Sequence, residues 1–149
     1  MAAWPRPALP ASRARTCHEE PPMTITLSNP AGVHTPGAYS HAALVKDAAA
    51  RLVISGQVGL AADGTLAPDG HGQIAQALAN LGTILGAHGM AKSNLVKMTV
   101  FLTDSAMVGP WRSARTAWLG GHAPASTLLI VAGLADSRFL VEVEAEAAA

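Results

Sequence analysis

Polar and apolar residues alternate over several short stretches in the first half of the chain. Residues 24–30 (TITLSNP) alternate and end at an Asn-Pro pair, which predicts a short strand. Residues 42–47 (AALVKD) and 51–60 (RLVISGQVGL) predict two further strands, and their short connection favours a hairpin. Residues 61–72, which carry two Asp-Gly pairs, then predict a long turn-rich segment.

In the middle of the chain the apolar residues recur at intervals of three and four. This spacing predicts a helix with one apolar face over residues 73–88, and Gly89 stands where a left-handed C-terminal cap is expected. Trp111 and Trp118 share a helical spacing within residues 105–119, which predicts a second amphipathic helix.

β-Branched and apolar residues dominate three later stretches. Residues 94–104 predict a central strand, and residues 126–134 and 139–147 predict two strands that end the fold. The predicted order is β-β-β-α-β-α-β-β. This order indicates an α+β domain, a single mixed sheet with both helices packed on one face.

The predicted strand at residues 126–134 is apolar on both of its faces. Leu128 and Ile130 lie on one face, and Leu129 and Val131 lie on the other. Such a pattern is typical of a strand that is covered on both sides. Because the two helices cover only one face of the sheet, we expect another subunit to cover the second face.

The composition supports one domain and argues against several classes of partner. The chain has 149 residues, of which 50% are hydrophobic and 13% charged, with a formal net charge of +0. So little charge favours an oligomer, and the neutral balance offers no basic surface for nucleic acid. No apolar run approaches the roughly 18 residues of a membrane span, so we expect no membrane partner. Cys17 is the only cysteine, which rules out an intrachain disulfide, and we expect a cytoplasmic protein.

Residues 1–22 differ in composition from the rest of the chain. They contain several prolines and three arginines, with no acidic residue before Glu19. The arginines are typical of a transit peptide, but the prolines interrupt any continuous helix. We therefore expect a disordered extension over residues 1–22, followed by a folded domain over residues 23–149.

Few residues have the spacing of a catalytic or metal-binding motif. The six histidines form no metal-binding pattern, and no serine lies in a G-x-S-x-G elbow, so no metal is expected. Glu142, Glu144 and Glu146 alternate along a predicted strand and share one face. For Glu144 and Glu146 we expect a solvent-exposed, charged strand face that discourages pairing with other strands. Glu142 lies nearest the apolar stretch, where partial burial would raise its pKa toward a range suited to proton transfer.

Two arginines and a tyrosine are further candidates. Arg112 and Arg115 lie three residues apart on the second predicted helix, where they either hold a carboxylate together or form the solvated side of the helix. Tyr39 is the only tyrosine and lies in a predicted loop. There are two alternatives for this residue: its ring has a packing role, or its hydroxyl group lines a ligand pocket.

Six stretches, taken in order and spacing, resemble the RidA family, also called YjgF or endoribonuclease L-PSP. The resemblance runs from about residue 36 to residue 147. The stretches are GAYSHA at 37–42, LVISGQVG at 52–59, the predicted helix at 73–89, VKMTVFLTD at 96–104, PAST at 124–127 and LVEVEA at 140–145.

The resemblance implies a chorismate-mutase-like α+β fold that assembles as a homotrimer around an inner barrel. A small-molecule cleft then lies at each subunit interface. The best-studied members of the family are deaminases that hydrolyse reactive imines and enamines, such as 2-aminoacrylate, to keto acids and ammonia without a cofactor. Other members have been described as translation inhibitors or endoribonucleases, which the neutral composition does little to support.

The family's site residues can be carried over one by one. Tyr39 matches the cleft tyrosine, Ser55 and Gly56 match a cleft serine and its neighbouring glycine, and Glu142 matches the acid that positions or activates water. The resemblance therefore implies a catalytic role for Glu142 and a substrate-binding role for the others.

Two positions depart from the family pattern. The signature Pro-Ala-Arg, whose arginine pairs with the substrate carboxylate, ends here in Ser126, and Arg112 stands where many deaminases have asparagine. A serine hydroxyl cannot provide the charged two-point contact of a guanidinium. We therefore expect a protein that binds a small metabolite between subunits and hydrolyses an imine, an enamine or a related nitrogenous compound. The alternative is a trimeric ligand-binding or sensor module without turnover.

Overall fold

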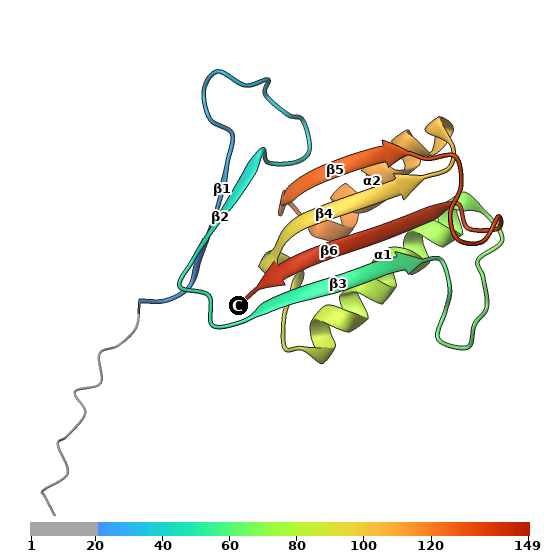
Figure 1. Ribbon diagram of the computed structural model, residues 1–149, viewed down its shortest axis with the longest axis horizontal. Helices are drawn as coiled ribbons and strands as arrows, with labels where there is room; N and C mark the ends of the chain where they lie inside the picture. The colour runs from blue at the N-terminus through green and yellow to red at the C-terminus, as the bar shows by residue number, and fades with distance from the viewer. Residues whose placement is uncertain (1–20) are drawn as a thin grey trace, which may run out of the picture.

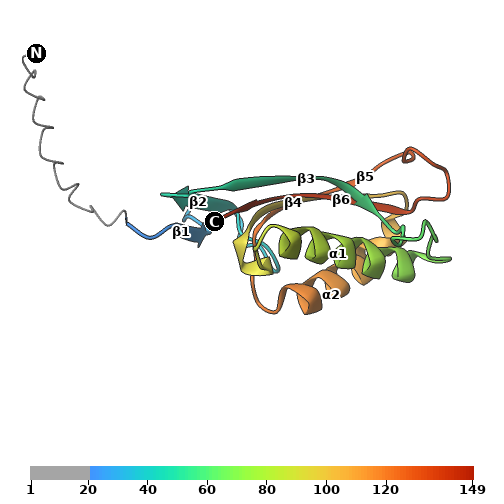
Figure 2. The same cartoon turned by 90° about the horizontal axis from the view of Figure 1, so that it is seen from below.

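The computed structural model describes residues 21–149, which form one α+β unit (Figure 1). Both helices pack on the same face of a mixed sheet, as Figure 2 shows, so the predicted fold class is confirmed. Two short 3-10 turns, Lys92–Asn94 and Ser105–Met107, precede β4 and α2. In chain order the elements are β1 (Thr24–Ser28), β2 (Ala42–Lys46), β3 (Arg51–Val58), α1 (Gly70–Ala87), β4 (Leu95–Leu102), α2 (Val108–Leu119), β5 (Ala125–Ile130) and β6 (Val141–Ala148).

The main sheet has four strands in the order β3-β6-β4-β5. β6 runs antiparallel to both of its neighbours, and β5 runs parallel to β4 at the edge. The prediction that residues 94–104 form a central strand is confirmed, because β4 pairs on both sides. β1 and β2 form a separate two-stranded sheet that lies beyond the end of the main sheet (Figure 1). The prediction of a single sheet is therefore wrong for these two strands, which pair only with each other.

The predicted hairpin between residues 42–47 and 51–60 is wrong. β2 pairs antiparallel with β1 instead, and β3 pairs with β6. The reason lies in the connection. Ala50 already exchanges two backbone hydrogen bonds with Ala149, at 2.8 and 3.0 Å. The β3–β6 ladder therefore begins at Ala50, which leaves no turn that could pair β3 with β2.

Both helices begin and end at residues suited to those positions. The Asp69 side chain accepts a hydrogen bond from the Gly72 backbone at 2.8 Å and caps α1. Gly89 has φ of 68°, as the sequence predicts for the residue that follows this helix. Gly120 ends α2 in the same left-handed region. The core lies between the helices and the sheet, around Ile74, Ala77, Leu78, Leu81 and Leu85 of α1 and Trp111 of α2.

Among residues 21–149, no segment covers the helix-free face of the sheet. On β6 the valines face the core and the glutamates face outward, as their alternation predicts. Leu128 of β5 packs against the core, whereas Leu129 is 45% exposed and Val53 of β3 is 66% exposed. The second cover expected for β5 is thus not supplied by residues 21–149.

Two further expectations concern the ends and the environment of the chain. The disordered extension predicted for residues 1–22 falls almost wholly outside the described residues. Within the described part, neither helix has the length and apolar character required to cross a bilayer.

Candidate functional site

A cavity of about 560 Å³ lies at the β5 edge of the sheet. Three segments border it: the loop before β2, the first two turns of α2, and the first half of β5. The side chains that form its walls include Tyr39, Trp111, Arg112, Arg115, Ser126 and Leu128. The cavity therefore brings together three predicted site residues, Tyr39, Arg112 and Ser126.

Backbone contacts hold the loop before β2 against the start of β5. Ser40 is buried, its backbone donates to the Pro124 carbonyl at 3.4 Å, and it forms an isolated parallel bridge with Ala125. The Tyr39 ring meets the His41 ring edge-on at 5.6 Å between centroids. Because Ser126 directly follows Ala125, these contacts hold Tyr39 close to Ser126.

The two arginines of α2 have different environments. Arg112 is exposed at the mouth of the cavity, whereas Arg115 is only 3% exposed. The Arg115 Nη1 atom donates to the Ala38 carbonyl at 2.7 Å, and burial lowers the pKa of its guanidinium. The interpretation of this pair as the solvated side of a helix is therefore wrong for Arg115. Its spacing of four from both Trp111 and Leu119, which are buried, is the signal that could have found it.

A second group of predicted residues lies on β3 and β6. Glu142 is half-buried on the helix-free face, and its side chain lies directly over Gly56 of β3. A Cβ added at Gly56 would stand 1.8 Å from Glu142 Oε1, so only glycine leaves room for this carboxylate. The register between β3 and β6 shifts between Ile54 and Gln57, and this irregularity places exposed Ser55 beside the pair.

The two groups do not meet within one chain. Ser126 pairs with Met98 and faces the helices, whereas Glu142 pairs with Phe101 and faces the opposite side of the sheet. They are separated by β4, by three residues along that strand, and by the thickness of the sheet. One group therefore borders a cavity that has cationic side chains, and the other presents a carboxylate on an uncovered face.

Residues 31–149 match the family model described as Endoribonuclease L-PSP. The chain belongs to this family, the RidA or YjgF family. A curated mouse relative, named 2-iminobutanoate/2-iminopropanoate deaminase, is 41% identical over 123 residues, which cover 80% of this chain and 85% of the relative.

Solved structures of RidA-family proteins have the same fold. The Rid protein YyfB of Yersinia pestis, whose function is unknown, superposes with a TM-score of 0.77 and 28% identity over 84% of this chain and 98% of that one. The structure of E. coli TdcF with bound serine superposes with a TM-score of 0.64 and 26% identity over 77% and 91%. Membership of the RidA family and the α+β fold thus rest on agreement between sequence and structure.

Proposed function

We propose that the protein is a cofactor-independent deaminase that hydrolyses a small imine or enamine in a cleft completed by a second subunit. The observation that carries this proposal is the Glu142 carboxylate held over Gly56 on an uncovered sheet face. Two relatives support the proposal. The mouse relative is named 2-iminobutanoate/2-iminopropanoate deaminase, and the structure of TdcF contains serine, which is similar in size to such an imino acid.

Glu142 is the residue best placed to handle water. Its carboxylate accepts a proton as water adds to the carbon of the protonated imine and forms a neutral carbinolamine. The resulting carboxylic acid returns this proton to nitrogen, and the carboxylate then takes the carbinolamine hydroxyl proton as the C–N bond breaks. Ammonia and the carbonyl product leave, and Glu142 gives its last proton to solvent. The exposed Ser55 hydroxyl and the Gly56 backbone, which lie beside this carboxylate, contact the substrate in this scheme.

A second subunit is needed to complete this cleft. Tyr39, Arg112 and Ser126 border a cavity on one side of the sheet, while Glu142 belongs to the other side. In a ring-shaped homotrimer each interface joins two different surfaces of the chain, so one subunit can supply the cavity and its neighbour the carboxylate. The exposed Leu129 on the edge strand supports such an interface.

Ammonia release tests the proposed reaction directly. Purified protein is mixed with freshly generated 2-aminoacrylate or 2-iminopropanoate, and ammonia is measured against a sample without protein. We expect faster release with the protein. Release at the uncatalysed rate, in both the wild type and a Ser126→Arg variant, would rule out deamination even as a latent activity.

A ligand-binding module without turnover is the second candidate, and Ser126 is the observation that favours it. If this module retains the family cleft, Ser126→Arg is expected to produce ammonia release that the wild type lacks, because a guanidinium can hold the substrate carboxylate at two points. Thr83→Arg is the control, since Thr83 is exposed on α1, away from both the cavity and the helix-free face. Equal gains from both variants would contradict a specific role for position 126.

Gly56→Ala tests the contact between Gly56 and Glu142. The new methyl group would overlap the carboxylate, so we expect Glu142 to swing away and ammonia release to fall at least about tenfold. The melting temperature should change little, because a flexible side chain absorbs the clash. Gly86→Ala is the control, since Gly86 lies on the exposed side of α1 with nothing within 4 Å of an added Cβ. An unchanged rate in Gly56→Ala would show that the position of Glu142 does not matter.

A further inference from the structure

Arg115 is the one buried side chain of the described region whose polar atoms lack partners. The Nε and Nη2 atoms of its guanidinium are buried and make no hydrogen bond within residues 21–149. Gln73, which is equally buried, shows the usual situation: its amide donates to the Ala67 and Arg138 carbonyls and accepts from the Leu140 backbone. Because an unpaired buried charge is costly, a group of this kind requires a physical explanation.

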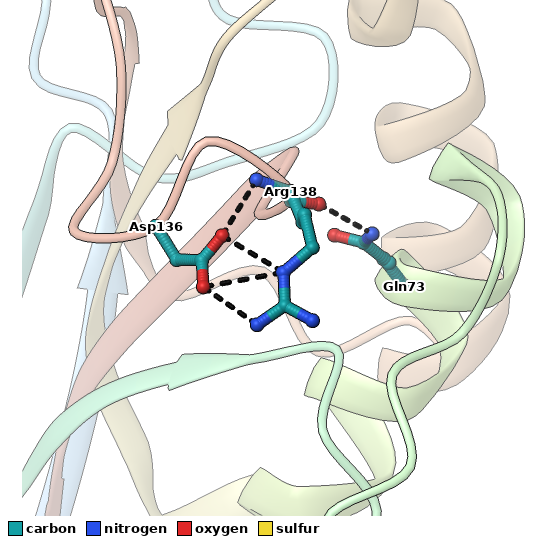
Figure 3. Close-up of polar contacts among 3 residues, drawn as sticks. All are labelled: Gln73, Asp136 and Arg138. Carbon is teal, nitrogen blue, oxygen red and sulfur yellow. Dashed lines mark hydrogen bonds and ion pairs between the residues drawn. The ribbon is translucent and has the colours of Figure 1, made fainter.

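The two unpaired atoms form the edge of the guanidinium that holds a carboxylate. Arg138 donates from Nε and Nη2 to the two oxygens of Asp136, at 3.0 and 2.7 Å (Figure 3). Arg51 uses the same two atoms on Glu146. Arg115 presents this edge without an acid, while its remaining nitrogen, Nη1, is fixed by the Ala38 carbonyl. The bond to Ala38 thus fixes the orientation of the guanidinium, and no acid within residues 21–149 pairs with its Nε and Nη2 atoms.

The cavity beside Arg115 suits a small anion. Arg112 and Arg115 both border it, and of the side chains that residues 21–149 place around it none is acidic. Trp111 and Leu128 provide apolar walls that fit a short hydrocarbon chain, and the Ser126 hydroxyl adds one neutral polar group. Positive charge beside apolar walls suits a ligand that carries a carboxylate on a short hydrocarbon chain.

We propose that Arg115 binds the carboxylate of a small 2-oxo or 2-imino acid side-on through Nε and Nη2. The proposal deepens the proposed function and rests on it, since it names the ligand class of the same cleft. The positive charge that the family places on β5 is supplied here from α2. The hydrogen bond from Arg115 Nη1 to the Ala38 carbonyl also connects the ligand-bound guanidinium to the loop that carries Tyr39.

Binding of pyruvate and of its neutral analogue pyruvamide tests this assignment. Calorimetric titrations compare the wild type with Arg115→Met, Arg115→Lys and Arg138→Gln, the last of which removes an exposed arginine away from the cavity. We expect the wild type to prefer pyruvate over pyruvamide. Arg115→Met should weaken pyruvate binding at least about tenfold and leave pyruvamide unchanged, because only the charged contact is lost. Arg115→Lys should recover part of the loss, and Arg138→Gln should match the wild type.

The melting temperature of the ligand-free protein separates a binding role from a structural one. A neutral methionine relieves a buried unpaired charge, so Arg115→Met should melt at the same temperature as the wild type or higher. If Arg115→Met loses affinity for pyruvate and pyruvamide equally and also melts at a lower temperature, the proposal is overturned and Arg115 has only a structural role. Wild-type affinity for pyruvate in Arg115→Met, or no preference for pyruvate in the wild type, would also overturn it.

Ammonia release distinguishes this inference from the proposed reaction. If the wild type prefers pyruvate through Arg115 but releases no ammonia, the carboxylate site stands and the deaminase proposal fails. If ammonia release and pyruvate binding both persist in Arg115→Met, the deaminase proposal stands and the role of Arg115 is wrong.

Discussion

Replacing Glu142 by glutamine is expected to slow ammonia release from 2-iminopropanoate by about 10²–10⁴-fold, the usual range for a lost general acid–base. Glutamine keeps the size of the side chain and its place over Gly56 but cannot accept a proton from water. Pyruvate binding should change much less than turnover, because the proposed carboxylate contact is made by Arg115. Steady-state ammonia release and calorimetric titration of the same variant check both expectations.

Glu144→Gln is the matched control for this variant. Glu144 lies two residues further along β6 on the same helix-free face, and within residues 21–149 it is exposed. It should retain the wild-type rate. Equal losses in the two variants would indicate a general effect of negative charge on this face, and wild-type turnover in Glu142→Gln would remove Glu142 from the reaction.

Leu129→Asp is expected to convert a trimer into single chains, with loss of turnover as a consequence. Leu129 is 45% exposed on the edge strand, on the face that no helix covers. A carboxylate there would be desolvated in the assembly without a partner, while the isolated chain would keep it in water. Native mass spectrometry checks this directly, and the melting temperature measured at low protein concentration shows whether the separated chain still folds.

Ala75→Asp controls for the added charge. Ala75 is exposed on α1, which packs on the helix-covered face of the sheet (Figure 2), so this variant should assemble and turn over like the wild type. A wild-type protein that already runs as a single chain would contradict the shared cleft. A Leu129→Asp variant that remains a trimer would place the interface elsewhere.

Local patterns predicted most of the elements because each element has one dominant buried face. The apolar spacing of three and four over residues 73–88 matches α1, whose core residues it names, and Gly89 adopts the predicted left-handed conformation. The partner of β2 could not be predicted in this way. A short connection favours a hairpin only if the two flanking strands pair with each other, whereas here β2 pairs with β1, and β3 pairs with β6 in a ladder that starts at Ala50.

The candidate site was harder to predict than the fold, because it depends on which face each side chain occupies. Alternation along one strand predicts that Glu142 and Glu144 share a face, but the relation between Glu142 and Ser126 requires the strand order and register. The burial of Arg115 is a different case. Its charge favours an exposed position, whereas its spacing of four residues from Trp111 and from Leu119 favours the buried face of α2. In the structure Arg115 lies on the buried face.

Mixing two inactive variants tests most directly whether the cleft is shared between subunits. Ser126→Trp fills the cavity on one half of the site, and Glu142→Gln removes the acid from the other. Each variant alone should be inactive. Suppose that each interface of a trimer combines the cavity of one subunit with the acid of the next. Trimers reassembled from an equal mixture of the two variants should then recover about a quarter of the wild-type rate, because each half of a site is intact in half of the cases. Hybrids that are no more active than their parents, although both variants are present in the same trimers, would contradict a shared cleft.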